Sequence, residues 1–313
     1  MILAGDVGAT KILLEVGEAR SDRWQPAFQR RYQLAEFANM SDVLAKFIGE
    51  LKSSHPSDGK ITAAAMGAAG PAVDNKVKMT HRSWILDGAH IAHDLGLARA
   101  TVVNDLDAAA NGIPWLPASD FSTIQEGPAI EHAPRVVLGV GTGLGIAYIV
   151  EGKVIPGEGG HAGFSPASAP THDLWAKLAM KHGRLEAEEV ASGTGISNIY
   201  RALTGKDADP ATITSGAQKG DPICRNVLEL FSECLGNVAG DHALSVMARG
   251  GVFLAGGVAA KNQSFFTDGR FMQSFLRKGR FVELMREMPV DLIVNEHVGL
   301  IGAAAVARAV GGR

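Results

Sequence analysis

A pattern of strand, glycine-rich turn and strand occurs twice in this chain, about 135 residues apart. The two turns are residues 5–10 and residues 141–145, and each combines glycine with threonine. The strands around them are predicted from short apolar runs at residues 2–4, 11–16, 136–140 and 146–150. A pattern repeated at this distance indicates an internal duplication, and therefore two halves of similar architecture.

The segments between these repeats mix strands with helices. Apolar spacing predicts helices at residues 42–51, 106–112, 171–182, 221–247 and 300–310, and further strands at residues 61–66, 76–80, 101–104, 252–255 and 292–294. Strands mixed with helices favour an α/β fold whose sheets are largely buried. The boundary between the halves is expected in the loop-rich residues 112–134 or slightly before them.

Composition narrows the functional classes. The chain has 30 basic and 33 acidic residues with no long run of one sign, so nucleic acid and anionic membranes are not expected as partners. No apolar run is long enough to span a membrane, and the charged Asp6 and Lys11 do not suit a signal peptide. Cys224 and Cys234 form no zinc or redox pair and are expected to be free thiols. A cytoplasmic protein is expected.

The 38 glycines among 313 residues exceed the usual share of about 7%. The turn at residues 5–10 is neither a Walker A loop nor a dinucleotide fingerprint, because a strand follows it. Backbone N–H groups and a threonine hydroxyl in such a turn suit an anion. Asp6 would repel a phosphate unless a divalent cation lies between them, which suggests a magnesium nucleotide. A plain hairpin is the alternative, although a second turn at residues 141–145 strengthens the nucleotide interpretation.

Two more predicted strands end in residues that could bind a ligand or take part in a reaction. The predicted strand at residues 252–255 runs into Gly256 and Gly257, where a ring or a phosphate could approach the backbone; a tight strand–helix turn is the alternative. Asn104 and Asp105 end another predicted strand, at the edge where α/β sheets bind ligands. Asp105 could accept the proton of an attacking hydroxyl, but the same pair could simply cap the following helix.

Three polar side chains suit sugar hydroxyls. Glu158 and His161 lie three residues apart in a glycine-bent loop, and Glu188 precedes a further glycine-rich segment. A zinc site is disfavoured because no second pair of ligands lies nearby. The alternatives are a solvated loop for Glu158 and His161, and a solvated helix face for Glu188 within its acidic stretch.

In their order and spacing, these segments resemble the bacterial glucokinase family, within the hexokinase, actin and Hsp70 superfamily. The resemblance runs almost from end to end and is carried by residues 5–10, 79–84, 104–105, 141–145, 156–161, 188–195, 255–257 and 298–302. It implies two α/β domains, each built around a ribonuclease-H-like sheet, with an interdomain cleft. Residues 1–108 and 297–313 would form the small domain, and residues 109–296 the large one.

The resemblance also assigns roles. It implies ATP-dependent phosphorylation of D-glucose at its 6-hydroxyl, the first step of glycolysis, with ATP and Mg²⁺ as cofactors and a homodimer as the assembly. The catalytic base would be Asp105, and the glucose contacts would be Asn104, Asp105, Glu158, His161 and Glu188. The nucleotide contacts would be Gly5, Asp6, Val7, Gly8, Ala9, Thr10, Gly141, Thr142, Gly143, Gly256 and Gly257, with Asp6 facing the metal.

Two departures from the family pattern stand out. Ala9 replaces a usual glycine, which is tolerable if its φ is negative. The segment at residues 67–71 is also plainer than usual. The zinc-binding cysteines of the related repressor, open-reading-frame and kinase family are missing from the sequence, which argues against that group. An actin-like ATPase, a sugar sensor without catalysis and a kinase for another hexose, such as mannose or fructose, remain as rival functions.

Overall fold

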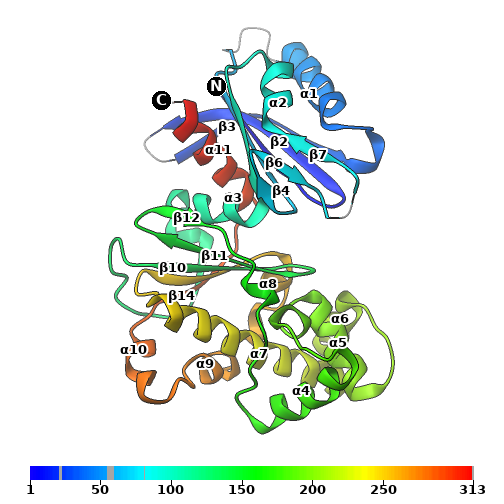
Figure 1. Cartoon of the computed structure of the whole chain (residues 1–313), viewed down its shortest axis with the longest axis vertical. Helices are drawn as coiled ribbons and strands as arrows, with labels where there is room; N and C mark the ends of the chain where they lie inside the picture. The colour runs from blue at the N-terminus through cyan, green and yellow to red at the C-terminus, as the bar shows by residue number, and fades with distance from the viewer. Residues whose placement is uncertain (21–22, 55–59, 81, 312–313) are drawn as a thin grey trace. The chain divides into compact units, whose positions relative to one another are not determined.

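The computed structural model describes residues 1–20, 23–54, 60–80 and 82–311. It divides into two compact units, Met1–Ser119 with His297–Arg313, and Asp120–Glu296, which are described separately below (Figure 1). The C-terminal residues belong to the first unit. The predicted division after residue 108 falls inside helix α3 (Asp105–Gly112), and the compact unit instead extends to Ser119.

A five-stranded sheet of order β3-β2-β1-β4-β8 forms the first unit. Strands β1 to β3 are antiparallel neighbours, whereas β1, β4 and β8 run parallel. The strands are β1 (Ile2–Val7), β2 (Lys11–Arg20), β3 (Arg23–Gln33), β4 (Ala63–Ala68) and β8 (Ala100–Asn104), and a small separate sheet contains β5 (Ala72–Val73), β6 (Lys76–Lys78) and β7 (Ile85–Asp87). The other helices are α1 (Met40–Ser54), α2 (Gly88–Leu95), α11 (Val298–Gly311) and the 3₁₀ turns Leu34–Glu36 and Ile113–Trp115.

The two faces of this sheet differ in the size of their buried side chains, which are larger on the face covered by α1 and α2 and smaller on the face covered by α11. Leu3 on β1 packs into a core with Phe47 of α1 and Ile91 of α2. Its neighbour Ala4 points to the other face, because side chains alternate along a strand, and packs against Leu300 of α11. Small side chains on this second face let α11 lie close to the sheet.

A six-stranded sheet of order β12-β11-β10-β13-β14-β9 forms the second unit. Its strands are β9 (Phe121–Gln125), β10 (Arg135–Val140), β11 (Leu144–Val150), β12 (Lys153–Ile155), β13 (Gly251–Ala255) and β14 (Val290–Ile293). Its helices are α4 (Ala169–His182), α5 (Gly193–Thr204), α6 (Pro210–Gln218), α7 (Pro222–Val246), α8 (Gly257–Lys261), α9 (Arg270–Phe275) and α10 (Val282–Arg286). Its 3₁₀ turns are η4 (Gly159–His161), η5 (Ala187–Glu189), Gln263–Phe265 and Gly279–Phe281. One more 3₁₀ turn, Ala118–Asp120, spans the point where the chain passes from the first unit to the second.

The predicted duplication is visible in the strand order. Strands β12-β11-β10-β13-β14 repeat the order and directions of β3-β2-β1-β4-β8, and β9 adds an antiparallel edge. Both glycine-rich turns join the matching strand pairs, β1 to β2 and β10 to β11. The α/β class is therefore confirmed, and each half places its turn at the same point of its sheet.

Some elements differ from the sequence prediction. The edge strand β3 was missed, because most of its side chains are exposed and Pro26 interrupts its apolar pattern. The acidic stretch before residue 192, predicted as helical, contains only the single 3₁₀ turn η5. In the described part of the chain, no helix combines the length and apolarity that a membrane span needs.

Candidate active site

The glycine-rich turn of the first unit, at residues 5–10, is a tight hairpin. The Gly8 N–H donates to the Lys11 carbonyl over 2.9 Å, which closes the turn between β1 and β2. Ala9 is not among the described non-glycine residues with positive φ, so its methyl group fits the backbone conformation that the sequence analysis required. The departure from the family's glycine therefore leaves the turn intact.

Asp6 lies one strand position before the end of β1, in an electrostatically unfavourable place. Burial and the negative charge of Asp105 raise the pKa of Asp6 to about 6, and His297 partly offsets this rise. The start of α11 is close by, since a Cβ on Gly299 would come within 3.7 Å of the Asp6 carboxyl. A cation beside Asp6 and Asp105 would stabilise the ionised forms of these two neighbouring carboxylates.

This arrangement predicts that Asp6→Asn stabilises the ligand-free protein. Native Asp6 holds its proton up to about pH 6, whereas an unfolded chain releases it near pH 4, so wild-type stability falls as the pH rises between these values. Asparagine mimics the protonated acid and should increase the free energy of unfolding at pH 7.5 by about 1–2 kcal/mol. Urea denaturation from pH 4 to pH 8, without nucleotide or metal, measures the difference, and a difference that does not change with pH would contradict the prediction.

Asn104 and Asp105 mark the point where β8 becomes α3. The Asn104 side chain caps the helix, because its Oδ1 accepts from Leu106 N–H at 2.9 Å and from Asp107 N–H at 3.4 Å. Its Nδ2 donates to the Gly70 carbonyl over 2.9 Å. The capping alternative is therefore confirmed for Asn104, and the cap fixes the direction of the neighbouring Asp105.

Asp105 is the first residue of α3 and its side chain is reached by water. Desolvation by the surrounding protein atoms raises the pKa of Asp105, while the hydrogen bond from Leu106 N–H at 2.8 Å counteracts the rise. A carboxylate whose basicity is increased in this way is better suited to accept a proton from a hydroxyl.

The second glycine-rich turn, at residues 141–145, is hydrogen-bonded to the start of helix α5. The Gly193 N–H donates to the Gly141 carbonyl at 2.8 Å, and Thr194 donates to the Thr142 carbonyl through both its N–H and its hydroxyl at 3.0 Å. The α5 N-terminus thereby satisfies its own free N–H groups and holds the turn rigidly. Gly143 completes the turn with a carbonyl that accepts from the Gly141 N–H.

Glu188 does not lie on a solvated helix face, so that interpretation is wrong. Its Oε2 accepts from the Leu144 N–H at 2.8 Å, and its carboxylate packs against Gly143. The turn η5 brings Glu188 to this position, with the Ser192 hydroxyl donating to the Glu188 carbonyl. A residue predicted to contact sugar is thus bonded directly to the predicted phosphate turn.

Glu158 and His161 lie at the two ends of the turn η4, in the loop that follows β12. The backbone of Glu158 forms a bridge with Ile146 of β11, and the His161 N–H donates to the Glu158 carbonyl. Both side chains are exposed, with His161 Nε2 4.0 Å from Glu158 Oε2. The two side chains therefore face the same solvent-accessible space.

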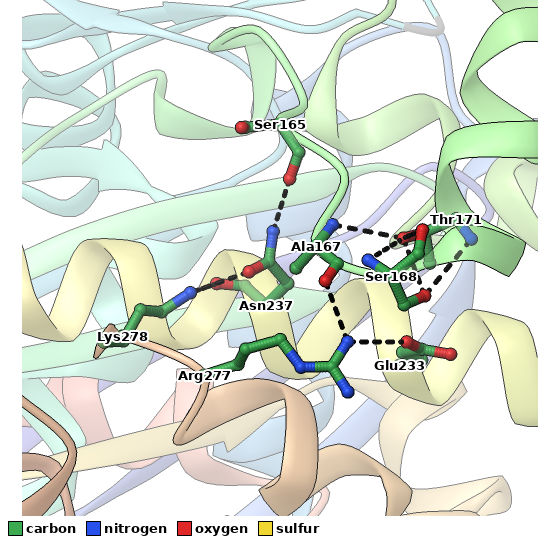
Figure 2. A network of polar contacts seen from close by, with 8 residues as sticks. All are labelled: Ser165, Ala167, Ser168, Thr171, Glu233, Asn237, Arg277 and Lys278. Carbon is green, nitrogen blue, oxygen red and sulfur yellow. Dashed lines mark hydrogen bonds and ion pairs between the residues drawn. The ribbon is translucent and has the colours of Figure 1, made fainter.

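The segment after this loop is anchored to α7 (Figure 2). Asn237 of α7 donates to the Ser165 carbonyl at 2.6 Å and accepts from the Lys278 ammonium at 2.7 Å. Arg277 donates to the Ala167 carbonyl at 2.8 Å. The two contacts of Asn237 are half-buried and that of Arg277 is exposed, and together they connect residues 165–167 to α7 and to the segment after α9.

A pocket of about 790 Å³ opens beside the second glycine-rich turn, between α5, α6 and α8. Its lining includes Thr142 of the turn, Val258 of α8 and a set of polar side chains that the sequence analysis did not single out: Ser197, Asn198, Arg201, Thr214, Ser215, Gln218, Lys261 and Asn262. Gly256 precedes α8 with φ 102°, and a Cβ there would overlap the Val140 carbonyl, so only glycine fits. The pocket has a volume that suits a nucleoside.

The predicted site residues therefore form two groups. Gly5, Asp6, Val7, Gly8, Ala9, Thr10, Asn104 and Asp105 belong to the first unit, whereas Gly141, Thr142, Gly143, Glu158, His161, Glu188, Gly256 and Gly257 belong to the second. His81, in one of the segments that carried the resemblance, lies outside the described residues. No group of three or more histidine, cysteine, aspartate or glutamate side chains within the described ranges could hold a metal by itself.

Solved glucokinases share this fold. A glucokinase from an Antarctic psychrotroph superposes with a TM-score of 0.88 at 28% identity, with 98% of both chains covered. A ROK family glucokinase from Streptomyces griseus, solved with glucose and AMPPNP, shares the fold with a TM-score of 0.69 at 19% identity and covers 98% of this chain and 99% of its own.

Sequence comparison defines the family more closely. A family model described as Glucokinase matches residues 3–310. The curated glucokinase of Nostoc punctiforme is 33% identical over 341 aligned residues, which cover 98% of each chain. The chain belongs to the glucokinase family.

Proposed function

We propose that this protein transfers the γ-phosphoryl group of MgATP to the 6-hydroxyl of D-glucose and releases ADP and glucose 6-phosphate. Membership of the glucokinase family supports the reaction. The structural observation that carries it is the bond from Leu144 N–H to Glu188, which joins a sugar-binding side chain to a phosphate turn. An ATPase that only switches shape would need the phosphate turns but not this arrangement of Glu158, His161 and Glu188.

Asp105 would act as the catalytic base. Its carboxylate orients the 6-hydroxyl and accepts the hydroxyl proton as the oxygen forms its bond to the γ-phosphorus and the bond to ADP breaks. Capping by Asn104 holds the start of α3, so the Asp105 carboxylate is already in position before substrate binds. We also propose that Asn104 contacts the sugar, through the second hydrogen of its amide.

The glycine turns would hold the phosphates. Backbone N–H groups of residues 5–10 and 141–143 can stabilise charge that develops on the transferred group. The pocket between α5, α6 and α8 would take the adenosine, next to Gly256 and Gly257. The proposed residues belong to both units.

The residues present fit a magnesium ion that arrives with ATP. Burial and the charge of Asp105 raise the pKa of Asp6 to about 6, and a cation beside this carboxylate would stabilise its ionised form. Mg²⁺ commonly binds through one or two carboxylates together with phosphate oxygens and water. Asp6 would hold the ion, directly or through water, and the bound ion would neutralise charge on the phosphates.

Further expectations follow from the family. We propose that each sheet is of the ribonuclease-H-like type, that the protein acts in the cytoplasm as a homodimer, and that its product enters glycolysis. The repeated strand order supports the first of these proposals. The resemblance supports the others.

The proposed reaction is tested by coupling ADP release and glucose 6-phosphate formation to separate readouts. We expect ATP consumption that depends on glucose, with one phosphorylated sugar formed for each ATP consumed. A panel with mannose and fructose is expected to give a lower kcat/KM, because a changed hydroxyl leaves one of the sugar-binding side chains without its partner. ATP hydrolysis that is indifferent to sugar would indicate a switch-type ATPase, and glucose binding without product would indicate a sensor.

A further inference from the structure

His161 is surrounded by carboxylates from two segments of the second unit. Its Nδ1 lies 2.8 Å from Glu186 Oε2, and its Nε2 lies on the side of Glu158, 4.0 Å from that carboxylate. Glu188 also acts on it electrostatically, and the Arg184 guanidinium donates to the His161 carbonyl at 2.8 Å. Of these carboxylates, Glu186 alone was not assigned a role by the sequence, the family resemblance or the proposed reaction.

The position of Glu186 is determined by backbone pairing. Glu186 forms an antiparallel bridge with Gly163, and its N–H donates to the Glu189 carboxylate at 2.9 Å. On either side, the Phe164 N–H donates to the Leu185 carbonyl and the Ala187 N–H to the Ala162 carbonyl, both at 2.9 Å. The segment that follows His161 and the segment that precedes Glu188 are therefore joined at Glu186.

The contact between Glu186 and His161 is a specific hydrogen bond at the edge of the site. The exposed fraction of the Glu186 side chain is 32%, compared with 53% for His161. Because an ionised carboxylate can only accept, Nδ1 of His161 must carry the hydrogen. This leaves Nε2 as the ring atom that is available to a ligand.

The chemistry of a sugar hydroxyl shows why this orientation matters. Ionised Glu158 and Glu188 only accept hydrogen bonds, so hydroxyl groups bound to them must donate and keep lone pairs available for another donor. Of these three sugar-binding side chains, only His161 can supply that donor, and it does so when Nε2 is protonated.

We propose that Glu186 is a positioning residue for sugar binding, which holds the imidazolium ring of His161 through Nδ1 so that the Nε2–H group donates to a hydroxyl of the substrate. This inference rests on the proposed function, because it names a further residue that supports the same sugar site. Electrostatics agrees with it: the hydrogen bond to Glu186 raises the pKa of His161, as do the charges of Glu188, Glu186 and Glu158, against the opposing effect of desolvation.

The first test is the variant Glu186→Gln, which keeps an acceptor for Nδ1 but removes the charge. In the wild type, the KM for glucose should stay constant at low pH and rise as His161 loses its proton. In Glu186→Gln the rise should begin at lower pH and give an about threefold higher KM at pH 7.5, with kcat within about twofold of the wild type. A purely structural disturbance would not move the pH at which KM rises.

The matched control is Glu189→Gln, which changes the neighbouring carboxylate in the same turn. Its KM profile should begin to rise at the wild-type pH. Identical KM profiles for Glu186→Gln and the wild type would overturn the proposal, as would the same displacement in Glu189→Gln.

The second test needs no catalysis and separates this inference from the proposed function. Nitrogen-15 NMR of the histidine rings in the ligand-free protein, assigned with His161→Asn, reports which ring nitrogen carries hydrogen and at which pH the ring titrates. We expect hydrogen on Nδ1 in the wild type, and titration at lower pH in Glu186→Gln. Calorimetric titration with glucose alone should show weaker binding by the variant at pH 7.5. If His161 titrated at the same pH in Glu186→Gln as in the wild type, the positioning role of Glu186 would be refuted, even in an active enzyme. If His161 titrated as expected but the protein did not bind glucose, the role of this pair in sugar binding would be refuted.

Discussion

Replacing Asp105 with asparagine is expected to lower kcat for glucose phosphorylation by about 10²–10⁴-fold. The amide cannot accept the hydroxyl proton, but it can still accept the hydrogen bond from Leu106 N–H, so the start of α3 should be preserved. The KM for glucose should change much less than kcat, because the loss concerns the transition state more than the bound sugar. Steady-state kinetics with a coupled assay measures both quantities.

The neighbouring Asp107→Asn provides the control for Asp105→Asn. It removes a negative charge from the same first helical turn, and it should retain most of the activity. Thermal denaturation of both variants should show that the folded state is retained. If Asp105→Asn kept a turnover within about threefold of the wild type, the assignment of Asp105 as the base would have to be abandoned.

Replacing Gly302 with alanine is expected to cause the largest loss of stability, about 3 kcal/mol. Gly302 lies where α11 crosses α3, and a Cβ there would overlap the carbonyl of Ala108 and come within 2.8 Å of the Gly112 nitrogen. Backbone atoms cannot turn aside as a side chain can, so the two helices must separate. Since Asp105 begins α3, activity should fall as well. Urea denaturation followed by circular dichroism measures the free energy of unfolding.

Gly49→Ala is the matched control for this prediction. Gly49 lies inside α1, and a Cβ there would meet no atom within 4 Å. Alanine should therefore be neutral or stabilise the protein by about 0.5–1 kcal/mol through its better helix propensity. An equal response of Gly49→Ala and Gly302→Ala would show that helix propensity, and not the close approach of α11 to α3, determines the effect.

Elements with strong local patterns were predictable. The helix at residues 221–247 was predicted within one residue at each end of α7 (Pro222–Val246), because Asp221 caps it and Pro222 suits its first turn. The duplicated turns were equally clear, since glycine clusters between apolar runs are a local signal. Strand β3 was not predictable in this way, because its partner β2 supplies hydrogen bonds to a segment with few buried side chains.

The polar residues of the candidate site were only partly predictable. Spacing left open whether Asn104 caps a helix, and the structure shows that it does. Spacing also left open whether Glu188 lies on a solvated helix face, and the structure excludes this, because Glu188 accepts a hydrogen bond from Leu144, 44 positions away in sequence. The pocket lining from α5 and α6 gave no signal either, since serine, threonine and asparagine on a helix are common without any ligand.

By itself, the sequence determined the α/β class, the duplication, the two glycine-rich turns and the family to which the chain belongs, because glycine clusters and apolar periodicity act over short distances. Only the tertiary structure decided which side chains meet. It bonded Glu188 to the glycine-rich turn at residues 141–145, placed Glu186 on His161, and both buried Asp6 and brought Asp105 near it, which together raise the pKa of the Asp6 carboxyl. These contacts join residues that are far apart in the chain, and their energies depend on burial and distance, which no local pattern specifies.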